Sequence, residues 1–224
     1  MWLEMRQIFD SLSYSPTVRA VILSGAGPKA FTAGLDIQAT SQSGPLAPRQ
    51  EEPSKDGARV ATATRRHILE FQDCVQSVEK CEKPVICVMH GFTLGLGIDI
   101  ATCADVRICS SDTQFAVKEV DIGLAADIGT LSRLPKIVGN SSWVKDVCLS
   151  ARTFGAEEAL RVGFVSGVYA SKDAAVEEAM RWAGIISGKS PVAVQATKEL
   201  LNWSRDHSVQ DGKLYLIRLS NRKG

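Results

Sequence analysis

The sequence lacks several features that would assign it to a functional class at once. Its 26 lysines and arginines face 25 acidic residues, so the formal net charge is only +1 and no overall field would hold it on nucleic acid or an anionic membrane. No apolar stretch is long enough to cross a bilayer. Residues 1–10 resemble neither an arginine-rich transit peptide nor a secretory signal. We therefore expect no nucleic-acid partner, no membrane span and no targeting signal in this chain.

Phosphate-binding and metal-binding signatures are also missing. There is no GxxxxGK[ST] run, and no GxGxxG segment opens a helix. The six cysteines form no CxxC pair and no cluster with histidine at metal-ligand spacing. We predict no metal site. We also predict that all six cysteines are buried, reduced thiols: Cys74, Cys81, Cys87, Cys103, Cys109 and Cys148.

The order of apolar patterns in this 224-residue chain favours an α/β fold in one main domain. A helical pattern at residues 2–12 precedes an apolar run at 20–24, and a second helical pattern at 68–78 leads into an apolar run at 85–89. A further strand is expected at 106–109. The later signals are mainly helical, at residues 141–149, 156–162, 174–186 and 192–203.

Two segments carry no pattern of a regular element. Residues 38–57 are rich in Ser, Gln, Pro, Glu and Arg, which predicts a mobile surface loop. Residues 212–224 do not show the pattern of a closing helix. We expect the chain to end without one.

Two glycine-containing segments follow predicted strands. Taken alone, Gly34 in the segment at 29–36 is most simply a turn residue. The segment at 90–99 leaves a strand through glycines and enters a helix, whose N-terminal N–H groups suit an oxyanion or a phosphate. His90 begins this segment, but a lone histidine at a strand end is more often structural, so we leave it out of the predicted site.

Acidic residues stand among apolar ones in two places. Asp99 lies between two isoleucines, and Glu119 and Asp127 lie in a stretch rich in Val, Ile, Leu and Ala. An acid in such surroundings is costly unless it is paired, hydrogen-bonded or used. Carboxylates that share an apolar cavity raise each other's pKa, which suits proton transfer near neutral pH. The alternative is that these acids are surface or salt-bridged residues of an unrelated α/β domain.

Several segments together resemble the crotonase (enoyl-CoA hydratase/isomerase) superfamily. They occur in the family's order and include AFTAGLD at 30–36, CADVR at 103–107 and FVSGV at 164–168. The segment at 117–135 and the run SRDHS at 204–208 are most similar to the dienoyl-CoA isomerase branch.

The resemblance implies a spiral of ββα units with a helical C-terminal region. We expect residues 1–140 to form the spiral core, without the strands that usually open it, and residues 141–224 to form the helical region. The family acts on acyl-CoA thioesters without a metal or redox cofactor and assembles as trimers or hexamers. The branch implies a mitochondrial or peroxisomal location.

The resemblance also implies roles for individual residues. The backbone N–H groups of Leu35 and Leu96 would form an oxyanion hole for the thioester carbonyl. Asp127 would remove a proton from C2 of a 3,5-dienoyl-CoA, Glu119 would return one at C6, and Asp99 would balance charge in the site. Residues that contact the substrate would be Ala33, Gly34, Asp36 and Gly95.

Two other functions stay open at this stage. An enoyl-CoA hydratase or a Δ3-Δ2 isomerase would share the fold and the oxyanion hole, although a hydratase would be expected to carry Glu at the positions of both Asp99 and Glu119. A catalytically silent acyl-CoA binder or assembly partner is the second alternative, because Leu96 stands where the family has the middle glycine of a Gly-Gly-Gly turn.

Overall fold

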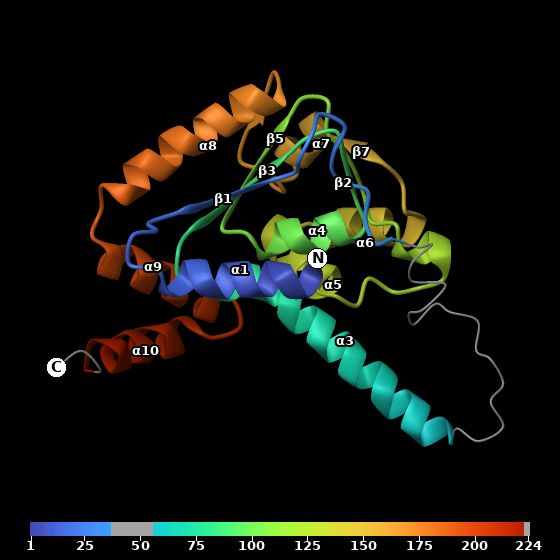
Figure 1. Cartoon of the computed structure of the whole chain (residues 1–224), viewed down its shortest axis with the longest axis horizontal. Coiled ribbons are helices and arrows are strands. Elements are labelled where there is room, and N and C mark those ends of the chain that lie inside the picture. The colour runs from blue at the N-terminus through green and yellow to red at the C-terminus, as the bar shows by residue number, and fades with distance from the viewer. Residues whose placement is uncertain (37–55, 222–224) are drawn as a thin grey trace.

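The structure of the chain is a computed structural model that describes residues 1–36 and 56–221. Nearly all of the surface loop predicted at residues 38–57 lies outside these residues. Within them, strands and helices alternate along the chain until residue 138, and helices dominate after it (Figure 1).

Two sheets of four strands form the centre of the molecule. In the first sheet all neighbours are parallel, in the order β1 (Val21–Ser24), β3 (Val85–Met89), β5 (Val106–Ser110) and β8 (Val168–Tyr169). The second sheet has the order β2 (Ala30–Thr32), β4 (Phe92–Leu94), β6 (Gln114–Ala116) and β7 (Phe154–Gly155), and its last strand is antiparallel.

Each turn of the chain adds one strand to the first sheet, the next strand to the second sheet, and then a helix. β1 and β2 precede α3 (Gly57–Lys80), β3 and β4 precede α4 (Leu96–Cys103), and β5 and β6 precede the short 3-10 helix η1 (Glu119–Ile122) and α5 (Thr130–Val138). Parallel neighbours require such crossover connections. The expected α/β spiral of ββα units is therefore present.

The remaining helices cover the sheets. They are α1 (Trp2–Tyr14), α6 (Ser141–Ser150), α7 (Ala156–Arg161), α8 (Lys172–Ser187), α9 (Pro191–Ser204) and α10 (Val209–Asn221). α8 packs on β1, β3 and β5, while α1 packs along α3 (Figure 1). The starts of α3, α6, α8 and α9 are capped by the side chains of Asp56, Asn140, Ser171 and Ser190, as polar N-caps predict.

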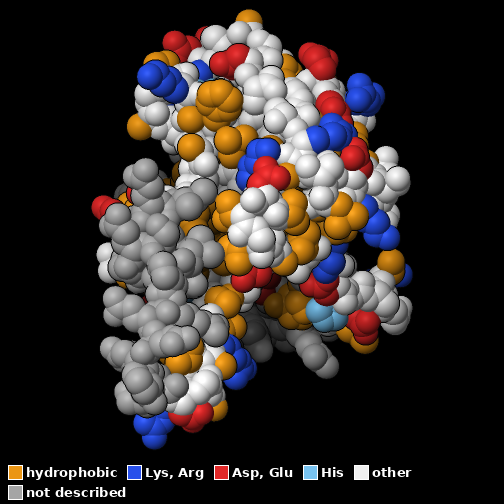
Figure 2. Space-filling model, turned by 90° about the vertical axis from the view of Figure 1, so that its right-hand side faces the viewer, with side chains coloured by type: hydrophobic (Ala, Val, Ile, Leu, Met, Phe, Trp, Pro, Cys, Tyr) orange, Lys and Arg blue, Asp and Glu red, His pale blue; other side chains and the backbone are white. Residues whose placement is uncertain are grey.

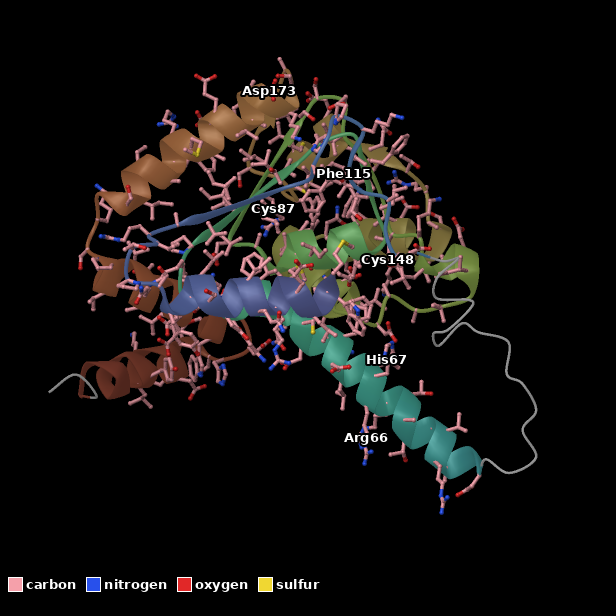
Figure 3. All side chains as sticks on the ribbon, viewed as in Figure 1. Arg66, His67, Cys87, Phe115, Cys148 and Asp173 are labelled. Atoms are coloured by element: carbon pink, nitrogen blue, oxygen red, sulfur yellow. The ribbon has the colours of Figure 1, made fainter. Side chains whose placement is uncertain are left out.

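The central strand β3 is buried on both faces, which explains its continuous apolar sequence. Cys87 belongs to the main core cluster, as does Phe115 (Figure 3). Ile86 and Val88 belong to a smaller cluster with Ala175 and Ala179 of α8. All six cysteines are buried and unpaired, which confirms the prediction of reduced thiols.

The expectation that the chain ends without a helix is wrong, because α10 runs from Val209 to Asn221. Ser208 and Asp211 form a reciprocal cap at its start. The Asp211 N–H donates to Ser208 Oγ at 3.2 Å, and the Ser208 N–H donates to Asp211 Oδ2 at 3.2 Å. The spacing of this capping box was visible in the sequence and was the missed signal.

The division at residue 140 stays a prediction. β7 and β8 lie beyond it and complete the two sheets, so the sheets draw on both parts of the chain. Across the described helices, none is long and apolar enough to cross a bilayer. Figure 2 shows apolar side chains set among charged ones on the face turned toward the viewer.

Candidate active site

The carboxyl ends of three parallel strands meet at one edge of the second sheet. β2 pairs with β4, and β4 pairs with β6 as far as Leu94 and Ala116. Residues that follow neighbouring parallel strands lie side by side, and this edge is where ligands usually bind in open α/β sheets. The edge therefore brings together three segments of the predicted site, at residues 33–36, 95–96 and 117–119.

The two candidate oxyanion donors lie on adjacent segments. A Cβ atom added to Gly34 would stand 3.2 Å from the Leu94 carbonyl oxygen and 4.0 Å from the Leu96 amide nitrogen. Gly34 has a φ of +99°, which permits this close approach without a side chain. Leu96 is the first residue of α4, and the first N–H groups of a helix have no acceptor within it. The turn at 33–36 and the start of α4 therefore lie side by side.

Glu119 lies against the turn that begins α4. A Cβ atom added to Gly95, whose φ is +50°, would stand 3.2 Å from Glu119 Oε1. Glu119 Oε2 is buried and has no hydrogen-bond partner among the described residues. Burial, and then the charge of Asp99, raise the pKa of Glu119 to about 7. A proton is therefore available on Glu119 near neutral pH, against Gly95 in the turn that begins α4.

Asp99 is almost completely buried in α4, with 1% of its surface exposed. Its Oδ1 accepts hydrogen bonds from the N–H and the hydroxyl of Thr130, both at 2.7 Å. Thr130 begins α5, so the carboxylate also meets the positive end of that helix. Burial raises the pKa of Asp99 to about 6, the two bonds from Thr130 and the charge of Arg133 oppose the rise, and Asp127 adds to it.

Asp127 differs from the other two acids because it is exposed. Asp127 is therefore the one of the three acids whose side chain is open to solvent. Asp127 follows a turn after Gly123 in which Leu124 is 40% exposed, although Ala126 directly before it is buried. Asp127 nevertheless lies near the pair, since its charge contributes to raising the pKa of both Asp99 and Glu119. Gln72 fixes its backbone by donating to the Asp127 carbonyl oxygen at 2.5 Å.

The remaining predicted site residues at this edge differ in exposure. Ala33, Leu35 and Asp36 are exposed, and Gly95 is buried. His90 is buried and its Nε2 lies 3.0 Å from the Gly27 carbonyl oxygen, an arrangement that suits the structural interpretation.

Sequence reasoning missed three residues around the acids. Thr130 donates hydrogen bonds to Asp99, and the charge of Arg133 lowers the pKa of Asp99. Cys148 on α6 lies close enough that the charges of Glu119 and Asp99 raise its pKa. Burial, and then these two acids, raise the pKa of Cys148 to about 11, so it remains a neutral thiol. No sequence pattern marks Cys148, whereas Gly129 is the N-cap of α5, a position at which glycine is one of the preferred residues.

A large cleft lies apart from the strand edge. It has a volume of about 1110 Å³ and runs between α3, α5 and α9. Among the described residues that line it, Asp127 is the one candidate site residue. Asp127 therefore stands between this cleft and the buried pair of acids. Within residues 1–36 and 56–221, no group of three His, Cys, Asp or Glu residues is arranged to hold a metal ion.

Comparison with known proteins identifies the family. The family model described as enoyl-CoA hydratase/isomerase matches residues 1–215. Mitochondrial Δ(3,5)-Δ(2,4)-dienoyl-CoA isomerase of Pongo abelii is 46% identical over 215 residues, which cover 96% of this chain and 64% of that protein. The peroxisomal protein of that name in Arabidopsis thaliana is 40% identical, with coverage of 96% and 75%.

A solved structure shows the same fold. It is a putative enoyl-CoA hydratase from Thermobifida fusca YX in complex with acetoacetyl-CoA, with a TM-score of 0.79 and 26% identity, covering 100% of this chain and 83% of that one. The chain belongs to the enoyl-CoA hydratase/isomerase family, and the expected fold is confirmed. It spans less than two thirds of the length of the Pongo abelii relative.

Proposed function

We propose that this chain binds an acyl-CoA thioester and converts 3,5-dienoyl-CoA to 2,4-dienoyl-CoA in fatty acid β-oxidation. The names of the relatives from Pongo abelii and Arabidopsis thaliana support the reaction. The acetoacetyl-CoA bound to the Thermobifida fusca protein supports the class of ligand. The proposed reaction moves protons only, so it requires neither a metal nor a redox cofactor.

In the proposed reaction the thioester carbonyl oxygen accepts hydrogen bonds from the N–H groups of Leu35 and Leu96. Ala33, Gly34, Asp36 and Gly95 flank the thioester. Removal of a proton from C2 places negative charge on this oxygen. Donors fixed beforehand stabilise the resulting conjugated enolate more than the neutral substrate, and this difference accelerates the reaction.

The three acids divide the proton transfers. Asp127 takes the C2 proton, and the electron pair of that C–H bond forms the C2=C3 double bond. The former C3=C4 pair moves to C4=C5, and the former C5=C6 pair takes a proton from Glu119 at C6. Asp99, buried behind the pair, fixes the charge balance of the site. Atoms and electrons balance, because one proton leaves C2 and one arrives at C6.

The observation that carries the proposal is the position of Glu119. It combines a pKa of about 7, a carboxylate against the Gly95–Leu96 turn and an oxygen without a partner. A general acid is most effective when its pKa lies near the working pH.

The test is the change in ultraviolet absorbance when the protein is mixed with a 3,5-dienoyl-CoA, with a 2-enoyl-CoA run in parallel. We expect the conjugated 2,4-dienoyl product and no hydration of the enoyl substrate. Asp127→Asn should lower turnover by about 10²-fold or more while acyl-CoA binding persists. Hydration of the enoyl substrate would favour the hydratase, and bound but unconverted substrate would favour the silent binder.

We further propose a homotrimer or hexamer located in the mitochondrion or peroxisome. The relatives' names support the location. Exposed apolar side chains on and beside η1 and α6 support an assembly, because isolated subunits rarely expose such groups together. They are Val120, Ile122, Leu124 and Leu149. Analytical ultracentrifugation tests the assembly, and a monomer at micromolar concentration would contradict it.

A further inference from the structure

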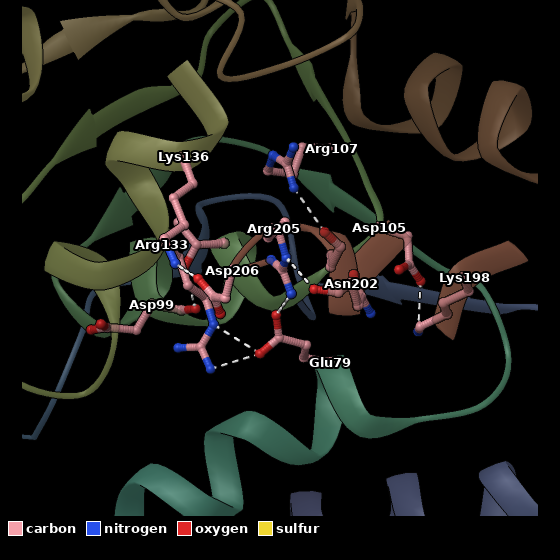
Figure 4. Close-up of polar contacts among 12 residues, drawn as sticks. Glu79, Asp99, Asp105, Arg107, Arg133, Lys136, Lys198, Asn202, Arg205 and Asp206 are labelled. Carbon is pink, nitrogen blue, oxygen red and sulfur yellow. Dashed lines mark hydrogen bonds and ion pairs between the residues drawn. The ribbon is translucent and has the colours of Figure 1, made fainter. Parts of the chain in front are cut away.

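The run at residues 204–208 resembles the isomerase branch, yet none of its residues takes part in the proposed chemistry. In the structure Arg205, at the end of α9, donates from Nη2 to Glu79 Oε1. The other carboxylate oxygen of Glu79 accepts two bonds from Arg133, from Nε at 3.0 Å and Nη2 at 2.8 Å (Figure 4). Three helices, α9, α3 and α5, are thereby joined by one chain of alternating charges.

The centre of this charge chain is buried. The side chains of Arg133 and Glu79 are 14% and 12% exposed, and Arg205 is 31% exposed. Burial alone would raise the pKa of Glu79, but the hydrogen bonds and charges of Arg133, and then of Arg205, hold it below its usual range. Glu79 is thus ionised between two cations. The three residues together carry one net positive charge that Glu79 does not cancel.

This net charge stands next to the site of Asp99. A Cβ atom added to Gly129 would collide with Arg133 Nη1, so the guanidinium lies against the residue before Thr130. Thr130 is the residue that donates both hydrogen bonds to Asp99. The two hydrogen bonds from Arg133 to Glu79 Oε2 fix the direction of the guanidinium. The attraction of Arg133 opposes the rise in the pKa of Asp99, in agreement with this placement.

We propose that Arg133, clamped by Glu79 and Arg205, is a positioning residue that keeps Asp99 ionised and so leaves the proton of the acid pair on Glu119. The inference rests on the proposed isomerase function and deepens it. The proposal also assigns a role to residues 204–208, because Arg205 is the second cation that binds Glu79. The end of α9 is thereby coupled to the acids at the strand edge.

The other groups that face Asp99 do not supply this attraction. Asp127 is an acid and opposes ionisation of Asp99, and the charge of Asp99 in turn raises the pKa of Glu119. Burial raises the pKa of Cys103 to about 12 and that of Cys148 to about 11, so both thiols are neutral. Thr130 contributes hydrogen bonds without charge. Arg133 is the cation that acts on Asp99 among the described residues.

The experiment follows the titration of Asp99 by carboxyl ¹³C NMR, with Asp99→Asn to assign its resonance, and measures kcat/KM for a 3,5-dienoyl-CoA over the same pH range. Arg133→Gln should raise the Asp99 midpoint by about one pH unit, a tenfold change in proton affinity. The acid limb of the kcat/KM profile should move by the same amount. Arg133→Lys, which keeps the charge, should restore most of the shift.

The matched control is Lys136→Gln, which removes a cation one turn along α5. Lys136 pairs with Asp206 rather than with Glu79, so the Asp99 midpoint should stay unchanged. An unshifted midpoint in Arg133→Gln, or an equal shift in Lys136→Gln, would overturn the proposal. If Arg133→Gln does not fold, Arg205→Gln decides: a smaller upward shift supports the proposal and no shift refutes it. Absence of turnover in the unmodified protein would refute the isomerase function, whereas the NMR titration would still test Arg133.

Discussion

Replacement of Asp99 by asparagine should stabilise the protein in a pH-dependent way. Asp99 is buried and its pKa is about 6, compared with an ordinary value of 3.8. An acid with a raised pKa in the folded state opposes folding once it ionises. Between about pH 4 and pH 6 the folded protein holds a proton that the unfolded chain has lost. Over that interval the stability contribution of Asp99 falls as pH rises.

The size of this effect follows from the change in pKa. A difference of about 2.2 between the two values, multiplied by 1.36 kcal/mol per unit, gives about 3 kcal/mol at pH 7.5 and almost nothing at pH 4. An asparagine keeps the shape of the neutral acid. Its Oδ1 accepts the bonds from the Thr130 N–H and hydroxyl that Asp99 Oδ1 accepts now. The variant should therefore gain up to about 3 kcal/mol at pH 7.5 and lose turnover.

The assay is urea unfolding followed by circular dichroism at fixed protein concentration, at pH 4 and pH 7.5. Asp173→Asn is the matched control, because Asp173 is exposed in the first turn of α8 (Figure 3) and should give no gain at either pH. A difference between Asp99→Asn and the unmodified protein that does not grow from pH 4 to pH 7.5 would refute the reasoning. It would mean that the carboxyl is not held in an environment that disfavours its charge.

Three further predictions concern the turn that begins α4. Glu119→Gln should lower kcat for a 3,5-dienoyl-CoA by about 10²-fold or more, because an amide cannot exchange the proton, and calorimetry should show that acyl-CoA still binds; full turnover would exclude Glu119 as the acid. Gly95→Ala should lower kcat at least about tenfold, since its Cβ at φ +50° would stand 3.2 Å from Glu119 Oε1 and displace the carboxylate; an unchanged kcat would contradict that placement. Leu96→Gly should not raise turnover. Among the described non-glycine residues only Ala151 has a positive φ, so the backbone of Leu96 is not strained. The half-buried side chain of Leu96 packs on the core, so the glycine variant should lose about 1–3 kcal/mol of unfolding free energy in urea.

Three of the four strands of the first sheet could be predicted from the sequence, whereas β8 (Val168–Tyr169) and the second sheet could not. β1, β3 and β5 are mainly apolar segments of four or five residues, long enough for their pattern to be recognised. β2, β4 and β6 have three residues each, which is too short for an alternation to stand out. Only their pairing with each other in three dimensions makes them strands. The candidate site residues follow these short strands, so the sheet edge at which the site forms could not be recognised from the sequence pattern.

The family resemblance identified the three acids as one site, whereas the burial and contacts of each acid could be learned only from the structure. Apolar neighbours in the sequence correctly suggested burial for Asp99, but Asp127 has similar neighbours and is exposed. The difference lies in the backbone. Asp99 is inside a helix whose inner face meets the sheets, while Asp127 lies in the turn before α5. Sequence neighbours report burial only where a regular element fixes which way the side chain points.

Burial raises the pKa of both inner acids, and the hydrogen bonds and charges around each of them oppose or add to that rise to different extents. Asp99 Oδ1 receives two donors from Thr130, and Arg133 supplies a positive charge. Glu119 Oε2 is buried without a partner. Hydrogen-bond donors and a nearby cation stabilise the ionised form of a carboxyl group, whereas burial without a donor destabilises that form. When both acids compete for one proton, Glu119 therefore takes it, in keeping with a pKa of about 7 compared with about 6 for Asp99. Two similar carboxyl groups acquire different tasks from their surroundings alone, and the one left with the proton is the one that lies against the Gly95–Leu96 turn.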